Sequence, residues 1–145
     1  MEKPRHAFYF EGILQLRSPS QEILDYVMKV AEHASKPFYT QLKKVRNGYD
    51  LYFLSQRFLQ QFGKRLQEKF GGEMKVSAHI HTRSRITSKD VYRINVLIRT
   101  PFYKVGDIIE FKGDLYKVLK MIKKVDLENL NTHKKLTVRY KDLPE

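Results

Sequence analysis

Two segments of the chain, residues 73–83 and 91–99, alternate between apolar and polar positions. The apolar positions are Met74, Val76, Ala78 and Ile80 in the first segment, and Tyr92, Ile94, Val96 and Ile98 in the second. A period of two places successive side chains on opposite faces of a strand, so each segment is expected to have one dry and one wet face. If the two segments pair as a hairpin, their wet faces lie side by side, and the connecting residues 84–89 add hydroxyl groups and two cations.

Two further segments have apolar positions at helical spacing. In the first, Ser18 is expected to cap the helix, Pro19 to take its first position and Gln21 to complete a capping box. In the second, Ser55 is expected to be the cap and the glycine pair 71–72 to end the helix. The apolar stripes are Ile23, Val27, Ala31 and Ala34 in one helix, and Phe58, Leu59, Phe62, Leu66 and Phe70 in the other. Both stripes predict helices that pack against a sheet.

The remaining part of the first 100 residues predicts three more strands. Residues 7–17 are rich in aromatic and branched side chains, as buried strands are. Residues 38–46 and 49–54 flank Asn47-Gly48, a pair that favours the type I′ turn of a hairpin. The order is therefore βαββαββ, with an antiparallel or mixed sheet that two helices cover.

The pattern changes after Thr100-Pro101, where short strands and tight turns follow one another without a helix. The expected strands are Val105–Phe111, Leu115–Ile122, about 124–128 and Leu136–Tyr140. Strands this short and closely spaced are typical of a small SH3-like barrel. We therefore predict an α+β fold with two domains: residues 1–100 form the helix-covered sheet and residues 101–145 form an SH3-like β-barrel.

Charge adds a function class to this picture. The 145 residues include 28 Lys and Arg against 16 Asp and Glu, a net charge of +12. Residues 1–100 carry 18 basic and 9 acidic side chains, and within residues 75–99 Asp90 is the only acid. A surface this basic favours phosphate, because each neutralised phosphate releases a counterion. Solubility alone is the alternative explanation.

Pairing of the two alternating segments would bring their wet faces together and make an RNA-binding platform. Arg makes bidentate contacts to phosphate, and hydroxyl, amide and imidazole groups add hydrogen bonds. The predicted RNA-binding residues are Lys75, His79, His81, Arg83, Arg85, Lys89, Arg93 and Arg99. The alternative is an ordinary solvated sheet face. Since this wet face offers no Phe or Tyr for stacking, recognition of RNA backbone and shape is favoured over reading of bases.

Catalysis and metal binding are disfavoured. His79 and His81 would face the same side of one strand, but zinc needs three or four ligands, and the chain has no Cys. No glycine-rich phosphate loop or nucleophile motif is present, so we predict no enzyme, metal or cofactor. A small nuclease that uses His79 and His81 stays open as a minor alternative.

No apolar run approaches the roughly 20 residues that span a bilayer, so no membrane contact is expected. The absence of Cys fits a reducing, cytoplasmic compartment. We expect a monomer.

Three segments in this order resemble the core of the nonsense-mediated decay protein 3 family. They are Phe10–Arg17 (FEGILQLR), Gly48–Ser55 (GYDLYFLS) and Ser84–Tyr92 (SRITSKDVY). The resemblance covers about residues 6–143. It implies a ribosome-assembly factor that occupies tRNA sites on the large ribosomal subunit, contacts rRNA and touches the L1 stalk. It also implies a ribosomal-protein-like α/β domain followed by an SH3-like domain that partly resembles initiation factor five-A.

The chain also departs from that family. Members begin with a zinc domain built from paired Cys motifs, so this chain is interpreted as a central to C-terminal fragment without it. The acidic, leucine-rich tail that carries export signals is also missing, which leaves nuclear export in doubt. The compact, Lys-rich sequence is more typical of an archaeal member. The rival function is a protein–protein adaptor that docks another assembly or translation factor through the barrel.

Overall fold

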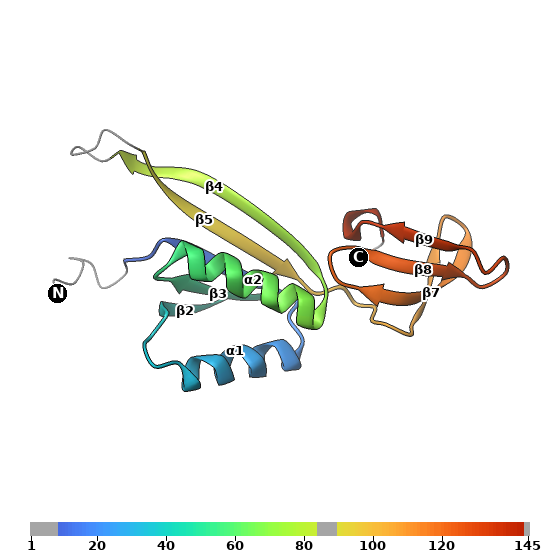
Figure 1. The fold of residues 1–145 in the computed structure, drawn as a ribbon, viewed down its shortest axis with the longest axis horizontal. Helices are drawn as coiled ribbons and strands as arrows, with labels where there is room; N and C mark the ends of the chain where they lie inside the picture. The colour runs from blue at the N-terminus through green and yellow to red at the C-terminus, as the bar shows by residue number, and fades with distance from the viewer. Residues whose placement is uncertain (1–8, 84–89, 144–145) are drawn as a thin grey trace.

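The computed structural model describes residues 9–83 and 90–143, and it describes side chains for all of these except residues 79–83 and 90–91. The elements in chain order are β1 (Gly12–Arg17), α1 (Gln21–His33), β2 (Tyr39–Val45), β3 (Gly48–Phe53), α2 (Gln56–Phe70), β4 (Glu73–Arg83), β5 (Asp90–Arg99), β6 (Ile108–Phe111), β7 (Asp114–Met121), β8 (Val125–Asn129), β9 (Lys135–Val138) and the short 3-10 helix η1 (Tyr140–Asp142). The predicted order βαββαββ is confirmed for the first seven elements, and the α+β class is confirmed with it (Figure 1).

The first sheet has five strands in the order β2-β3-β1-β5-β4. β1 runs parallel to β5, and the other neighbours are antiparallel, so the sheet is mixed. The buried positions of β1, β3 and β5 alternate along each strand and form one core with the apolar stripes of both helices. The central members of this core are Leu14, Leu16, Ile23, Val27, Leu51, Phe53, Leu59, Phe62, Leu66, Val96 and Ile98. Both helices therefore cover the same face of the sheet.

The helix ends follow the local sequence. Ser55 caps α2 as predicted, because its Oγ accepts a hydrogen bond from the N–H of Phe58 at 3.2 Å. Gly71 ends α2 with a φ of 75°, a conformation that glycine adopts without steric cost. The prediction for α1 is wrong by two residues: the cap is Ser20, whose Oγ accepts from the N–H of Ile23. Ser18 lies outside the helix with a φ of 51°.

The β2–β3 hairpin is confirmed, but its predicted type I′ turn is wrong. Arg46 and Asn47 connect the strands, and of the two only Asn47 has a positive φ, at 67°. A type I′ turn needs two such residues. Gly48 is required for a different reason: a Cβ there would lie 1.8 Å from the carbonyl oxygen of Leu16 on β1. The β6–β7 turn does have two consecutive positive φ values, at Lys112 and Gly113.

The second sheet is a four-stranded meander in the order β6-β7-β8-β9. One face buries a small core with the segment before β6 and with η1; its members are Tyr103, Ile109, Phe111, Val118, Val125, Leu127, Val138, Tyr140 and Leu143. No pairing between β6 and β9 is present among the described residues, so the sheet is barrel-like in its curl and connectivity without being closed by hydrogen bonds.

The two sheets meet where α2 leads into β4. The backbone N–H of Gly72 donates a buried hydrogen bond to Tyr140 Oη at 2.9 Å, and Tyr140 Oη donates to the carbonyl oxygen of Ile122 at 2.7 Å. The same segment is held from the helix side, since Gln67 Nε2 donates to the carbonyl oxygen of Gly72 at 3.0 Å. One tyrosine hydroxyl thus ties the second sheet to the end of the first.

Candidate nucleic-acid interface

The first sheet has one face without a helix, and we call it the open face. Its side chains alternate with the core positions of the same strands. They come from all five strands and are Ile13, Gln15, Arg17, Gln41, Lys43, Val45, Asp50, Tyr52, Glu73, Lys75, Ser77, Arg93, Asn95, Leu97 and Arg99. Strand β1 shows the contrast directly, since its residues alternate between buried and half-buried along its length.

The sequence-based prediction that β4 and β5 form a hairpin is confirmed. Lys75 lies opposite Leu97, and His79 lies opposite Arg93 in the antiparallel register. The register shifts between Ile80 and Thr82, so the simple alternation of β4 does not continue to its end.

The structure does not describe the side chains of five of the eight predicted RNA-binding residues, so their place on this surface stays a prediction. These are His79, His81, Arg83, Arg85 and Lys89. The remaining three, Lys75, Arg93 and Arg99, all lie on the open face. Lys75 is exposed, and the two arginines are half-buried.

The open face also carries two carboxylates, which form ion pairs with its arginines. Arg99 forms an ion pair with Glu73 at 3.4 Å, and Arg17 on the adjacent strand forms one with Asp50 at 2.8 Å. Register explains this outcome: Arg17, Arg99 and Glu73 lie side by side across β1, β5 and β4. The open face therefore carries the five cations Arg17, Lys43, Lys75, Arg93 and Arg99 against two acids, among its described side chains.

An aromatic cluster that the sequence did not indicate lies at the end of the open face nearest the N-terminus. Phe10 packs edge-on against Tyr52, with ring centroids 4.8 Å apart. The guanidinium carbon of Arg93 lies 3.8 Å from the centroid of Phe10, while Arg93 Nε donates to the carbonyl oxygen of Phe10 at 3.1 Å. Lys43 Nζ lies 5.8 Å from the Tyr52 ring. The described wet-face side chains of the β4–β5 hairpin include no Phe or Tyr, as expected, and the Tyr52 ring joins the open face from β3. The alternation Leu51-Tyr52-Phe53 was the signal that could have placed Tyr52 there.

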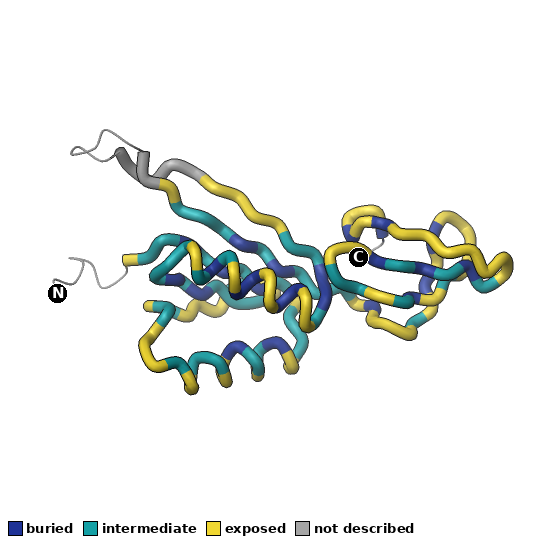
Figure 2. The backbone as a smooth tube through the Cα atoms, in the orientation of Figure 1, coloured by how far each residue is buried: buried dark blue, intermediate teal, exposed yellow. Residues whose placement is uncertain are grey.

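The expected dry face of the β4–β5 hairpin is only partly dry. Val96 and Ile98 are buried, but Val76 and Tyr92 are each 47% exposed. Figure 1 shows the reason: the hairpin runs on past the beginning of α2, so its outer part has no helix beneath it. Figure 2 shows the corresponding change along β4, from intermediate burial at Glu73 and Met74 to exposed residues at 75–78.

At its other end the open face leads into a cavity of about 570 Å³ at the junction of the two sheets. Lys75 and Arg99 line it from the open face, and Tyr103, from the segment before β6, and Tyr140, from η1, line it from the other side. Burial is the main cause that raises the pKa of Tyr103 to about 12, with smaller contributions from Tyr140 and the Glu73 carboxylate. Burial also raises the pKa of Tyr140, so both hydroxyls stay protonated near neutral pH.

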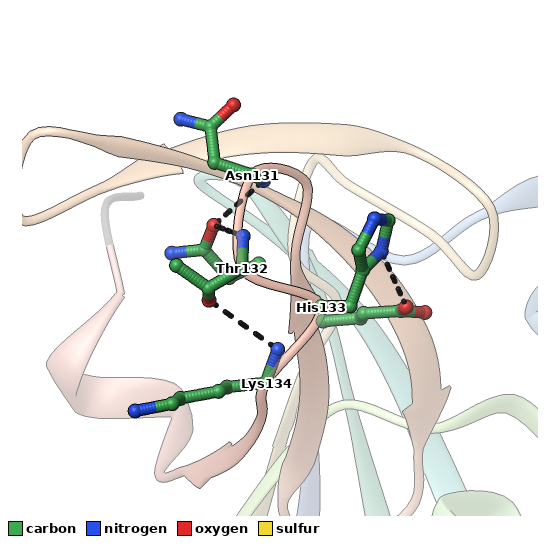
Figure 3. A network of polar contacts seen from close by, with 6 residues as sticks. Asn131, Thr132, His133 and Lys134 are labelled. Carbon is green, nitrogen blue, oxygen red and sulfur yellow. Dashed lines mark hydrogen bonds and ion pairs between the residues drawn. The ribbon is translucent and has the colours of Figure 1, made fainter.

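A second basic feature lies at the far end of the second sheet, in the turn between β8 and β9 (Figure 3). The side-chain oxygen of Asn129 accepts from the N–H groups of Asn131 and Thr132, at 2.8 and 3.0 Å. Thr132 Oγ1 accepts from the N–H of Lys134 at 3.3 Å, and His133 Nδ1 lies 3.3 Å from Glu128 Oε2 (Figure 3). Hydrogen bonds within the turn thus fix its conformation, and the side chain of Lys134 is exposed next to His133.

The family comparison bears on the first sheet. The family model described as NMD3, second domain, matches residues 9–100, from just before β1 to the end of β5. The chain belongs to the NMD3 family. No curated protein is significantly similar to the chain. The family resemblance in the sequence is thereby confirmed, and its archaeal origin stays a prediction.

The NMD3 family is associated with biogenesis of the large ribosomal subunit. The matched segment contributes the whole open face and both of its ends. Within the described side chains, no group of three His, Asp or Glu residues could hold a metal ion, and no described helix is long and apolar enough to cross a bilayer.

Proposed function

We propose that the chain binds the large ribosomal subunit during its maturation, with the open face against rRNA. The observation that carries this proposal is the open face itself: a sheet covered by helices on one side only, which presents five cations against two acids on the other. Surface cations that are not fully paired lower the free energy of phosphate binding through counterion release. The activity is occupancy of the tRNA sites and the L1 stalk region, without catalysis, metal or cofactor.

The aromatic cluster refines the mode of binding. A ring that carries a guanidinium on one face is a platform on which an RNA base can stack, since stacking tolerates any base. Phe10 and Tyr52 would therefore stack on unpaired bases, in addition to the contacts with the RNA backbone that the sequence leads us to expect. We propose contact with structured RNA that contains single-stranded positions, without sequence specificity.

The experiment is binding of the chain to purified large subunits across a salt series. The test variant combines Lys43→Ala with Arg93→Ala, which removes two cations from the aromatic end of the open face. The control combines Arg57→Ala with Lys64→Ala, which removes two exposed cations from α2 on the opposite side of the sheet. We expect a several-fold loss of affinity and a salt slope lower by roughly 1.5 for the test variant, and no change for the control.

Equal binding by both variants would refute the open face as the RNA contact. The tip of the β4–β5 hairpin is tested in the same assay by the triple replacement of Arg83, Arg85 and Lys89 with Ala. A loss in the triple variant alone would move the contact from the open face to the hairpin tip.

The alternative is a protein–protein adaptor, and the second sheet offers a specific reason to consider it. Val105, Ile108 and Leu115 are each more than half exposed there. We propose that this SH3-like unit binds ribosomal protein rather than RNA. We also propose that the protein is a cytoplasmic monomer. Buried apolar contacts are poorly screened, so the adaptor predicts binding that survives high salt, whereas the open face predicts a steep loss.

A further inference from the structure

The cavity at the junction of the two sheets has the size and lining of a ligand site. Its volume of about 570 Å³ lies within the range of small-molecule sites, about 300–1,000 Å³. Its walls come from β1, the β2–β3 turn, β4 and β5 on one side and from the segments around Tyr103 and Tyr140 on the other. The hydrogen bonds of Tyr140 to Gly72 and Ile122 hold the two sides together.

The charges around the cavity favour an anion. Arg17, Lys75, Arg99 and Lys141 line it, against the single carboxylate of Glu73. Two hydrogen bonds orient the Arg17 side chain: its Nη1 donates to Asp50 Oδ1 at 2.8 Å and to the carbonyl oxygen of Leu16 at 3.2 Å. A guanidinium oriented in this way loses little further freedom when it binds a phosphate.

An aromatic side chain stands at the same cavity. Phe102 is 68% exposed, the highest value among the exposed large apolar side chains of the described residues. It touches Tyr103 edge-on, with ring centroids 5.2 Å apart. An exposed phenyl ring beside clustered cations matches the two halves of a nucleotide, because the base stacks on the ring and the phosphate pairs with the cations.

We propose that this cavity binds one 5′-phosphorylated nucleoside, with its base against Phe102 and its phosphate among Arg17, Arg99 and Lys141. The chemistry is shared by an unpaired nucleotide of RNA and by a free mononucleotide. The proposal that the nucleotide belongs to an RNA rests on the proposed function, because Lys75 and Arg99 belong to both the cavity and the open face. An RNA strand on the open face would thus end with one nucleotide in the cavity.

The test uses the intact 145-residue chain and three probes: a five-nucleotide single-stranded RNA, adenosine 5′-monophosphate and inorganic phosphate. Binding is followed by the NMR shifts of the amides of Ser18, Asn47, Thr100 and Tyr103, which line the cavity. The proposal predicts that the RNA or the mononucleotide shifts these amides. It also predicts that inorganic phosphate binds more weakly than either, because phosphate has no base to stack.

Three variants separate the contributions. Phe102→Ala should weaken nucleotide binding about tenfold and leave phosphate binding unchanged, since one stacked base is worth on the order of tenfold or more. Phe102→Tyr keeps the ring and should restore the affinity. Ile108→Ala is the control, because this side chain is 58% exposed on the second sheet and does not line the cavity.

The outcomes decide the proposal and its source. Shifts with RNA alone identify an RNA nucleotide, and equal shifts with the mononucleotide identify a free ligand; both support the cavity as a nucleotide site. The proposal is overturned if neither probe shifts the cavity amides, or if Phe102→Ala binds nucleotide as well as Ile108→Ala does.

Failure of the cavity and failure of the proposed function are distinguishable. The Lys43→Ala and Arg93→Ala substitutions lie at the other end of the open face, outside the cavity lining. If the cavity proposal is wrong, their effect on large-subunit binding persists. If the proposed function is wrong, the cavity amides still respond to nucleotide while subunit binding is absent or insensitive to salt.

Discussion

The two faces of the five-stranded sheet use alternate residues of the same strands for different purposes. On the covered face, Leu14, Phe53 and Val96 are fully buried against the helices. On the open face their neighbours Ile13, Tyr52 and Asn95 stay half-exposed among cations and polar groups. Stability therefore depends on one set of positions and ligand binding on the other, and substitutions on the two faces should have separable effects.

The separation ends at the margins of the sheet. At the hairpin, the covered side loses its helix and becomes exposed at Val76 and Tyr92. At the junction, the open side becomes the wall of a cavity that Lys75 and Arg99 line. These margins are where a substitution can affect both folding and binding.

The largest expected effect is on the covered face. Phe62 is fully buried and packs against Tyr26, Phe53 and Phe58 with ring centroids 5.8–6.2 Å apart. Phe62→Ala should lower the free energy of unfolding by about 3–5 kcal/mol, since it removes apolar contacts and leaves a void. Urea denaturation measures the change. The exposed α2 substitution Lys64→Ala serves as the control and should change the free energy by less than about 0.5 kcal/mol.

The second prediction concerns the close approach of strands β1 and β3. Gly48→Ala would place a methyl group against the carbonyl oxygen of Leu16, so the strands must separate, at a cost of about 3 kcal/mol. Asn47→Gly is the matched control in the same turn, because glycine accepts the positive φ of that position. If Gly48→Ala unfolds at the urea concentration of the unmodified chain, the close approach does not determine the choice of glycine.

The third prediction tests the junction through pH. The pKa of Tyr103 is about 12 in the folded chain against 10.0 for an ordinary tyrosine, so the folded state holds this proton more tightly. The stabilisation is complete below pH 10 and is lost as pH rises through 12, because the unfolded state ionises first. At pH 12 the loss is about 2 kcal/mol. Tyr103→Phe should remove that part of the decline, as urea denaturation at pH 9 and pH 12 would show; equal declines in both chains would contradict the assignment.

The sequence predicted correctly those features that depend only on residues close together in the chain. The Ser55 cap, the glycine stop of α2 and the strand alternation around Val96 each depend on neighbours a few residues away, and each is confirmed. The misplaced cap of α1 reflects two similar candidates, Ser18 and Ser20, that lie only two residues apart; Ser20 caps the helix, while Ser18 has a positive φ outside it.

The candidate site was harder to predict because it depends on strand register. Nothing local in the sequence indicates that Arg17 lies beside Arg99, a pairing set by the parallel contact of β1 with β5. The same holds for Phe10 and Arg93, which are far apart in the chain and in contact in space. The sequence-based inference covered the wet face of the β4–β5 hairpin alone, whereas the register adds Asp50 and Tyr52 of β3 to the same open face.

The smallest expected effect on stability comes from the open face, at Lys75. This side chain is exposed, lies opposite Leu97 and lines the cavity from the open face. Lys75→Ala should leave the free energy of unfolding within about 0.5 kcal/mol of the unmodified chain. If Lys75 contacts one phosphate, the slope of log affinity for large subunits against log salt should fall by about 0.7–0.9, which is the release of one counterion. A loss of stability with an unchanged slope would reverse the assignment of the two faces at this position, because it would make Lys75 part of the fold rather than of the binding surface.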